Sequence, residues 1–440
     1  MINVNDYDYK QIWQARKLAR PKGNPHGNKV SYKDLVCAFD IETSRLADIE
    51  QSIMYIWQFQ IEDTTIYGRT WPEFIHFCKE VKRRLRGQWL VVYIHNASYE
   101  FQFLKGIYEF EPDEVFATES RKVLKFTMFD ALEFRCSYLH SNMSLAEFLH
   151  KMGVKHEKQS GFDYTKVRYP WTALTADEML YCINDVRGLV EALKIEMKHD
   201  GDTLYTVPLT STGYVRRDCK KAMRRFNHKQ LAEILPTPEV YRLLREAFRG
   251  GNTHASRWYA RDILTNVYSC DRSSSYPDVM VNCEFPMSMF HVEHNANAQR
   301  VKDLIYTKGK AVIMRCKFEN VRERDMFIGC PYLSKDKCRN IAGGKFDNGR
   351  VLEADYLETT ITDIDFKMIL DLYTWTAFEA ETLAYARYKK LPQPLIDVII
   401  DYYKRKTELK GVSGQELYYL KSKNKLNSCY QVWNVCARPC

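Results

Sequence analysis

The hydrophobic pattern between residues 35 and about 205 alternates between segments typical of strands and segments typical of helices. Apolar runs or two-residue alternation predict strands at 35–39, 52–60, 65–67, 89–94 and 122–134. Helical spacing of apolar residues predicts helices at 71–85, 143–152 and 175–197. This alternation predicts an α/β domain whose sheet is mixed rather than purely parallel.

The second half of the chain combines a polar connection with further strand and helix signals. Residues 206–265 are polar and basic, and Leu264–Cys270 predicts a strand that runs into Asp271. Asn348-Gly349 predicts the tight turn of a hairpin. Pro394 opens a predicted helix, and a second one covers about 416–430, so these two form a basic helical hairpin.

Composition narrows the class of protein. The 440 residues are 45% hydrophobic and 28% charged, which is typical of a globular chain with two or more domains. No apolar run is long enough for a membrane span, and the first residues have no signal-peptide core. Thirteen scattered cysteines suit free thiols in a reducing compartment. We therefore expect a soluble, cytoplasmic protein.

Basic residues gather at two places along the chain. Lys+Arg 65 against Asp+Glu 56 gives a net charge of +9, and residues 1–33 and 403–425 carry an excess of lysine and arginine. Aromatic residues interleave with both stretches, a combination typical of nucleic-acid binding. Ordinary solvated faces are the alternative explanation.

Two carboxylates follow the first predicted buried strand. Asp40 and Glu42 are two residues apart, and residues with this spacing on a strand point to one side. Paired acids repel each other unless a cation lies between them, and oxygen ligands favour Mg²⁺ or Mn²⁺. A strand end at the surface is the alternative.

Two further elements carry polar groups that could join this pair. Asn96, Tyr99 and Glu100 follow another buried strand and begin a helix. Tyr181 and Asp185 have the four-residue spacing that places them on one helix face. A helix cap with packed aromatics, and an unrelated surface pair, are the respective alternatives.

In order and spacing this set resembles the 3′-to-5′ exonuclease domain of family B DNA polymerases, an RNase H-like fold with two metal ions. The resemblance implies that Asp40, Glu42 and Asp185 hold the metal, that Tyr181 orients the attacking water, and that Glu100 stands at a position where the family usually carries aspartate. It further implies that a single-stranded primer end is held by these residues: Thr43, Asn96, Tyr99, Ser144 and Leu145. Lys158 and Tyr164 resemble accessory residues of the same site, although the lysine spacing differs by one.

Two later motifs resemble the polymerase signatures of the same family. Asp271–Pro277 is similar to the first, which implies a metal ion on Asp271 and a sugar stacked on Tyr276. Lys423–Tyr430 is similar to the second, and it implies nucleotide binding by Lys423, Asn427 and Tyr430. Lys406 is a further candidate for binding the phosphates. The substrates implied are primer-template DNA and deoxynucleoside triphosphates.

A further motif, Phe248-Arg249-Gly250-Gly251, resembles a linker of the protein-primed bacteriophage branch of this family. This resemblance implies that Arg249, Gly250 and Gly251 bind DNA and that a terminal protein is a partner. It also implies the cytoplasm of a bacterial host cell as the location. On this basis the fold is α/β, an RNase H-like exonuclease domain followed by an incomplete palm and fingers polymerase domain with an insertion. The expected parts are an N-terminal extension (1–34), the exonuclease domain (35–205), a linker (206–262), the first part of the palm (263–290), the insertion with palm strands (291–385) and the fingers hairpin (386–440).

The third polymerase motif of the family, Asp-Thr-Asp, is not found after Tyr430. Asp363 and Asp365 precede the second motif and are a poor substitute for it. We therefore expect a truncated polymerase or one half of a split enzyme, completed by a second polypeptide, in which excision is favoured over synthesis. The alternatives are a stand-alone exonuclease, a catalytically dead remnant that binds DNA or terminal protein, and a zinc site at Cys330 and Cys338.

Overall fold

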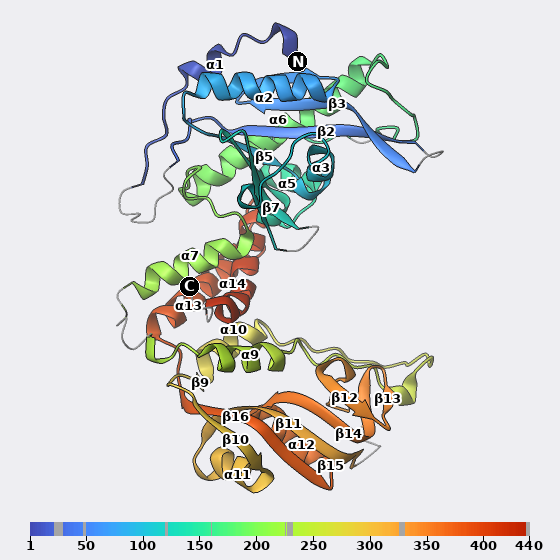
Figure 1. Cartoon of the computed structure of the whole chain (residues 1–440), viewed down its shortest axis with the longest axis vertical. Helices are drawn as coiled ribbons and strands as arrows, with labels where there is room; N and C mark the ends of the chain where they lie inside the picture. Colours follow the sequence, from blue (N-terminus) through green and yellow to red (C-terminus); the bar gives the residue numbers. More distant parts are fainter. Residues whose placement is uncertain are drawn as a thin grey trace. The chain divides into compact units, whose positions relative to one another are not determined.

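The chain forms two compact units in the computed structural model. The model describes residues 1–21, 30–46, 50–118, 122–159, 161–224, 226, 232–324 and 331–436. Unit 1 comprises Met1–Val215 with Lys406–Lys425, and unit 2 comprises Arg216–Arg405 with Leu426–Cys440 (Figure 1). Among the described residues, no helix has the length and apolar character that a bilayer span requires.

Unit 1 is built on an eight-stranded sheet in the order β1-β4-β3-β2-β5-β8-β7-β6. Its strands are β1 (Ile2–Asn3), β2 (Cys37–Leu46), β3 (Gln51–Ile61), β4 (Thr64–Gly68), β5 (Leu90–Ile94), β6 (Val115–Ala117), β7 (Val123–Met128) and β8 (Leu132–Cys136). The pairs β1–β4, β2–β5 and β5–β8 are parallel and the others antiparallel. The prediction of a mixed sheet is therefore confirmed.

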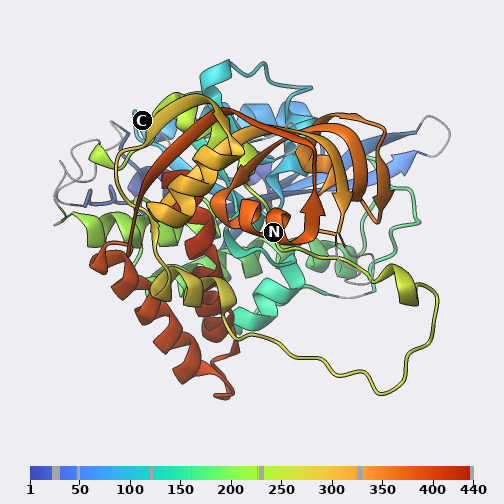
Figure 2. The same cartoon turned by 90° about the horizontal axis from the view of Figure 1, so that it is seen from below.

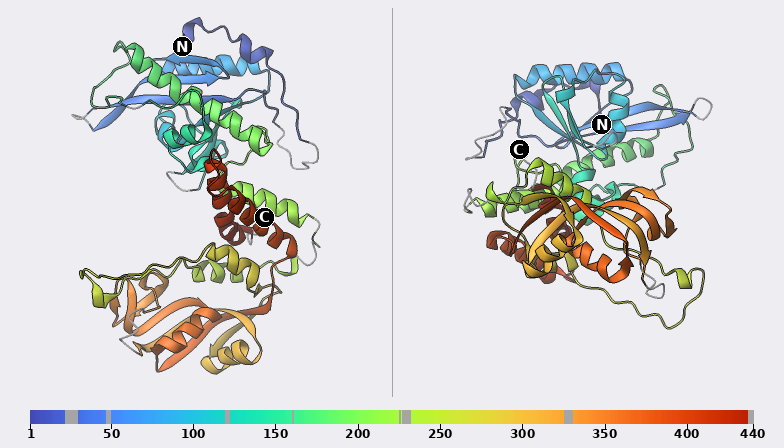
Figure 3. Two further views of the ribbon diagram at one scale, coloured as in Figure 1. Left: turned by 180° about the vertical axis from the view of Figure 1, so that it is seen from behind. Right: turned by 60° about the horizontal axis from the view of Figure 1, so that its bottom comes forward.

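Helices cover both faces of this sheet. The helices of unit 1 are α1 (Lys10–Gln14), α2 (Trp71–Leu85), α3 (Ala97–Leu104), α4 (Tyr138–Ser141), α5 (Leu145–Met152) and α6 (Ala176–Asp200), while α7 (Ser211–Met223) contributes residues to both units. The apolar stripe of α2 packs on one face, where Phe74 and Phe77 join Phe39 and Trp57 (Figure 3, right). The opposite face is covered by α5 and α6, whose Phe148 and Leu189 are buried in a second core with Val91 and Tyr93 of β5.

The end of α6 that carries its functional residues is held close to α5. Gly188 lies where a Cβ atom would overlap the carbonyl oxygen of His156, so only glycine allows this approach. The helix starts with a capping box in which Thr175 and Glu178 bond each other's backbone N–H groups. Both features fix the position of the intervening turns, which carry Tyr181 and Asp185.

Residues at the N-terminus take part in the core of unit 1. β1 pairs in parallel with β4, and Val4, Tyr7, Tyr9 and Ile12 are buried against the α2 side of the sheet. This placement was not predicted, because two-residue strands and single aromatic residues give no periodic signal.

Unit 2 is built on an antiparallel sheet in the order β10-β16-β11-β14-β12, to which three short strands are attached. The strands are β9 (Phe285–Pro286), β10 (His291–Asn297), β11 (Lys310–Glu323), β12 (Cys338–Ala342), β13 (Lys345–Asp347), β14 (Arg350–Thr362), β15 (Tyr373–Thr374) and β16 (Ala377–Lys389). Asn348-Gly349 joins β13 to β14, as predicted.

The helices of unit 2 are α9 (Pro238–Ala247), α10 (Ser275–Asn282), α11 (Ala298–Lys302) and α12 (Asp363–Leu372). Phe366 and Ile369 of α12 are buried in the main core of the sheet, while Val240 and Leu243 of α9 pack with Ile313 and Ala384. Two longer helices, α13 (Gln393–Leu409) and α14 (Glu416–Cys436), contribute residues to both units and correspond to the predicted helical hairpin.

The structure corrects two local predictions. Leu264–Cys270 forms no strand: it lies in the long irregular segment between α9 and α10, where Ile263 is 95% and Tyr268 96% exposed (Figure 2). Apolar alternation gives a strand only where a neighbouring strand pairs with it, and no described strand does so here. In addition, β2 continues to Leu46, so Asp40 and Glu42 lie inside the strand rather than at its end.

A buried charged network attaches the first turns of α14 to α6 within unit 1. Lys421 Nζ lies 2.5 Å from Glu196 Oε1 and 3.1 Å from Asp200 Oδ2, and His140 Nε2 lies 2.6 Å from Glu196 Oε2. Burial acts against charge on Glu196, but the charges of His140 and Lys421 lower its pKa to about 2. Leu417 joins the core beside this network, so apolar packing and ion pairing hold the same helix turn.

Replacing Lys421 by methionine should destabilise unit 1 by about 3–5 kcal/mol, because the buried Glu196 would keep only His140 as a charged partner and Asp200 would lose its bond to the ammonium. Urea unfolding followed by tryptophan fluorescence measures this loss. Lys198→Met, at an exposed lysine of α6, is the matched control and should change the free energy of unfolding by less than about 0.5 kcal/mol. Equal effects of the two substitutions would contradict the role given to Lys421.

The same network predicts a pH dependence. The folded state holds the pKa of Glu196 at about 2, below its ordinary value of 4.5, so the carboxylate stabilises the fold above about pH 4.5. This contribution is lost as the pH falls from 4.5 toward 2. The stability difference between the wild type and Glu196→Gln should therefore shrink as the pH falls below 4.5, as measured by urea unfolding at each pH.

Candidate metal centre

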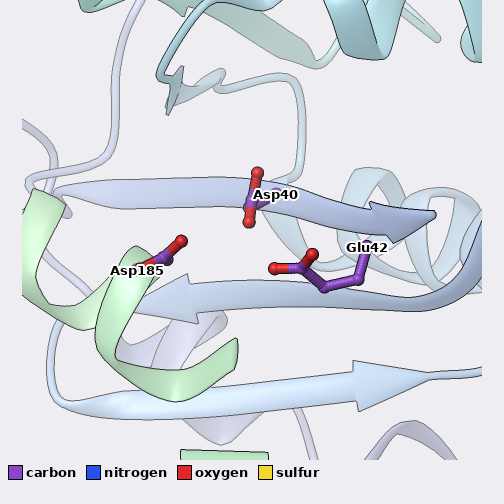
Figure 4. A group of neighbouring side chains, drawn as sticks. All are labelled: Asp40, Glu42 and Asp185. Carbon is purple, nitrogen blue, oxygen red and sulfur yellow. The ribbon is translucent and has the colours of Figure 1, made fainter. Parts of the chain in front are cut away.

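Three of the predicted acidic residues lie together between the sheet and α6 of unit 1. Asp40 and Glu42 project from the same side of β2, and Asp185 projects toward them from α6 (Figure 4). One carboxylate oxygen from each of the three lies within 4.8 Å of the others. Side chains from positions far apart in the sequence thus converge on one point, as the sequence predicts.

The local structure of β2 explains this convergence. The strand lies between β3 and β5, and the alternation of side chains sends Asp40 and Glu42 to the face that α6 covers. The register with β3 shifts between Glu42 and Thr43, where Tyr55 of β3 is the extra residue. Both acids therefore lie in the regularly alternating part of β2, directly before this irregularity.

Burial and mutual repulsion work against charge at this centre. Asp185 is 4% and Glu42 9% exposed. Burial, followed by the charge of Asp185, raises the pKa of Asp40 to about 7, and burial followed by the charge of Asp40 raises that of Glu42. A cation bound among the three oxygens would remove both penalties.

The donor set fits a hard divalent cation. Asp185 Oδ1 is buried and accepts no hydrogen bond within the described residues, while its other oxygen is paired with the ammonium of Lys158. An unsatisfied buried carboxylate oxygen that faces two further carboxylates is suited to coordinate a metal ion. Oxygen ligands without sulfur or nitrogen favour Mg²⁺ or Mn²⁺ over softer metals.

Glu100, the fourth acid of the prediction, lies at the edge of the centre. It is 3% exposed on α3, and its Oε2 has no hydrogen-bond partner among the described residues. Burial and the neighbouring charge of Asp40 raise its pKa. It is not part of the group of three whose oxygens lie within 4.8 Å.

Tyr181 lies one helical turn before Asp185 and is held by three aromatic or charged contacts. Its hydroxyl is 2.6 Å from the hydroxyl of Tyr164, its ring stacks on Phe162 with centroids 4.3 Å apart, and Lys158 Nζ lies 4.7 Å from its ring centroid. Burial raises the pKa of the Tyr181 hydroxyl, so the group keeps its proton. Lys158 and Tyr164 therefore contact the centre from a segment that precedes α6.

A cavity of about 590 Å³ opens beside the acids. Its walls include Asn96, Ser144 and Leu145, three of the residues expected to hold a strand. The other two, Thr43 and Tyr99, are joined by a hydrogen bond of 2.6 Å between their hydroxyl groups, and Tyr99 is 43% exposed. A volume of this size suits a small polar ligand or the end of a chain of linked units.

The sequence did not single out His95 or Tyr138, which also line the cavity. The ring nitrogens of His95 bond Ser137 Oγ and the carbonyl of Met143, both at 3.0 Å. Burial lowers its pKa to about 4, so the imidazole is neutral at physiological pH. Its position directly before Asn96 was the signal that could have indicated it.

The predicted residues of the second half belong to less enclosed surroundings. Asp271 is exposed, and no described carboxylate, histidine or cysteine forms a metal-binding group with it. Tyr276 lies on α10, and a Cβ atom on Gly251 would be 3.7 Å from its hydroxyl, so the glycine loop approaches this motif. Arg249 Nη2 donates to Thr359 and Thr360 of β14, at 3.4 Å each.

Lys423 and Asn427 are exposed on α14, and Lys406 is partly buried on α13. The side chain of Tyr430 and the residue Cys330 lie outside the described part of the structure. Asp363 and Asp365 have structural partners: Asp363 accepts from Val312 and Tyr388, and Asp365 caps α12 and bonds Tyr332. These contacts agree with their exclusion as a metal pair.

Comparison with known proteins identifies the class. The model of the family "DNA polymerase type B, organellar and viral" matches residues 151–430. Phi29 DNA polymerase in complex with single-stranded DNA has a similar fold, with a TM-score of 0.66 at 14% identity over 90% of this chain and 67% of that one. Its ternary complex with primer-template DNA and incoming nucleotide gives 0.65 at 14% identity, over 90% and 68% of the two chains. No curated protein matches the chain in sequence.

Replacing Asp185 by asparagine should weaken Mn²⁺ binding at this centre. Loss of a residue that only supports a metal ligand costs roughly 10- to 100-fold in metal affinity, and loss of a ligand itself should cost at least as much. The substitution removes a charge but keeps the size of the side chain. Isothermal titration with Mn²⁺ measures the change, and Asp113→Asn, at an exposed acid of the same unit, is the control. Undiminished Mn²⁺ affinity in Asp185→Asn would exclude this carboxylate from the site.

Proposed function

The chain belongs to the type B DNA polymerases of organelles and viruses, and from this premise we propose that unit 1 is a 3′-to-5′ exonuclease. The observation that carries the proposal is the convergence of Asp40, Glu42 and Asp185 within 4.8 Å beside an open cavity. The proposed reaction is hydrolysis of the terminal phosphodiester of a DNA strand, in which water adds to phosphorus and the 3′ oxygen leaves.

Asp40, Glu42 and Asp185 are the residues that would hold two divalent ions. The chemistry that bound Mg²⁺ or Mn²⁺ supplies is charge neutralisation at the attacking and leaving oxygens of the phosphodiester. The three carboxylates provide the negative charge that retains the ions, and their burial keeps bulk water from competing. Lys158, which is paired with Asp185, would add positive charge beside the phosphodiester.

Tyr181 is proposed to orient the attacking water. Its hydroxyl keeps its proton because burial raises the pKa, so it acts as a hydrogen-bond partner rather than as a base. The hydroxyl of Tyr164 at 2.6 Å and the ring of Phe162 at 4.3 Å fix its direction. A water held in one orientation loses less entropy on reaching the transition state.

The cavity and the Thr43–Tyr99 pair would hold the single-stranded end. Asn96 and Ser144 offer polar groups to sugar and phosphate, and Leu145 offers an apolar contact. Tyr99 presents a 43% exposed ring on which a base can stack. Glu100, which is buried beside Asp40, is proposed as the fourth acidic residue of this catalytic site.

Unit 2 and the helices α13 and α14 carry the residues proposed for nucleotidyl transfer. Asp271 would bind a metal ion and Tyr276 the sugar of the incoming nucleotide, while Lys406, Lys423, Asn427 and Tyr430 would bind its phosphates and base. The backbone at Gly250 and Gly251 and the side chain of Arg249 are proposed to contact DNA. The partners proposed are primer-template DNA, a terminal protein that primes synthesis, and a polypeptide that supplies the remaining palm carboxylates.

The exonuclease is tested with the purified 440-residue polypeptide, a 5′-labelled single-stranded oligonucleotide and Mg²⁺. We expect stepwise shortening from the 3′ end, abolished in Asp40→Ala with Glu42→Ala. Tyr181→Phe, which removes one hydroxyl group, should slow excision by roughly 10- to 100-fold. Gel electrophoresis of the products over time measures both effects.

Lys198→Met serves as the control, because this lysine of α6 is exposed and should leave the excision rate unchanged. Shortening that persists in the double alanine variant would remove the assigned site. A wild-type chain that binds oligonucleotide but never shortens it would instead favour a DNA-binding remnant without catalysis.

A further inference from the structure

An exposed tryptophan stands on the segment that leads into α6. Trp171 is 79% exposed, but its ring orientation is restricted because it stacks on the ring of Tyr169. The two ring centroids are 5.0 Å apart and the ring planes differ by 5°. One face of the indole is therefore covered by tyrosine and the other is presented to solvent.

The backbone under these rings is fixed by hydrogen bonds. Arg69 Nη2 donates to the carbonyls of Tyr169 at 3.0 Å and Thr172 at 2.8 Å, and Tyr169 N donates to Thr172 Oγ1 at 2.9 Å. Such a clamp keeps the turn in one conformation. A large apolar ring that is held rigidly in water pays no ordering cost when a flat ligand binds to it.

A buried ion pair ties the same segment to the metal centre. Arg168 donates to Glu178 Oε1 through Nε at 2.9 Å and Nη2 at 2.7 Å, and its backbone N–H donates to Ser44 Oγ at 2.8 Å. Glu178 lies one turn before Tyr181 on α6, and Ser44 lies two residues after Glu42 on β2. The segment that presents Trp171 is therefore anchored to both elements that carry the acids.

These links limit the distance between Trp171 and the acids. Two residues of strand, one hydrogen bond and three residues of extended chain span at most about 25 Å between Glu42 and Trp171. At the 3.4 Å rise of a stacked strand this corresponds to about seven nucleotides. Single-strand sites commonly cover 4–16 nucleotides, so a strand that ends at the acids can reach the tryptophan.

We propose that Tyr169 and Trp171 form a stacking platform for a base of the single-stranded DNA whose 3′ end occupies the metal centre. The proposal rests on the proposed exonuclease function and extends its substrate site beyond the cavity. Unpaired bases offer a free face to an indole, whereas bases inside a duplex are already stacked. The platform is expected to be tolerant of sequence, because every base has such a face.

Binding of oligothymidylates in EDTA tests the proposal, because the strand is not cut without metal. Fluorescence anisotropy gives the Kd of 5′-labelled dT4, which is shorter than the roughly seven stacked nucleotides that about 25 Å corresponds to, and of dT16, which is longer. We expect Trp171→Ala to weaken dT16 binding by about 5- to 150-fold and to reduce the affinity advantage of dT16 over dT4. Trp171→Phe should retain most of that advantage.

Two controls sharpen the test. Trp13→Ala removes another exposed tryptophan of unit 1, 47% exposed on α1, and should leave the Kd of dT16 unchanged. One abasic position moved along dT16 should weaken binding to the wild type where the missing base is the one that stacks on Trp171, and at that position it should have no further effect in Trp171→Ala.

The proposal is overturned if the dT16 affinity of Trp171→Ala lies within twofold of that of the wild type. This is the result expected if Trp171 contacts a partner protein instead of DNA. It is equally overturned if dT4 and dT16 weaken by the same factor, because the loss would then arise in the cavity. This binding experiment does not measure excision. If the chain does not shorten DNA but Trp171→Ala still reduces the affinity advantage of dT16 over dT4, the exonuclease proposal is refuted and the stacking platform is not.

Discussion

Repulsion among three neighbouring carboxylates is the constraint on which the first unit depends. Asp40 and Glu42 of β2 and Asp185 of α6 lie together with little exposure to water, and within the described residues Lys158 is the one cation that bonds the cluster directly. One ammonium cannot neutralise three acids, so the arrangement is at its most stable with bound cations. The surrounding structure keeps it in place: β2 is held between two strands, and α6 is fixed by its cap, by Gly188 and by the Glu196 network.

Local sequence signals sufficed for elements whose ends are chemically marked. The helix at 71–85 has the predicted bounds because Thr70 and Glu73 form a capping box and Arg86 ends it in the left-handed conformation. The strand expected at 264–270 failed for the opposite reason, since strand formation depends on a partner that the local sequence does not encode. The burial of Tyr7 and Tyr9 is likewise a tertiary effect, set by the packing of α2 rather than by periodicity.

The metal centre was predictable in its parts but not in its assembly. Spacing alone placed Asp40 with Glu42 and Tyr181 with Asp185; that the pairs meet was implied only by the family resemblance. Lys158 and His95 could not be given their contacts from sequence, because each bonds a group far along the chain: Asp185 for the lysine, Ser137 and Met143 for the histidine. Such contacts depend on how α5 and α6 pack on the sheet, which no local pattern records.

Asp271 and the acids of unit 1 differ in how far water solvates their charge. Asp271 is exposed, so water solvates its charge and nothing in its surroundings requires a cation. The acids of unit 1 are poorly solvated by comparison. Burial raises the pKa of Asp40 to about 7, and Asp185 Oδ1 has no hydrogen-bond partner among the described residues. A polar atom kept buried without a partner costs stability, and a fold retains that cost where a ligand removes it. The case for a metal site is therefore strong at Asp40, Glu42 and Asp185 on physical grounds alone, whereas at Asp271 it depends on family membership.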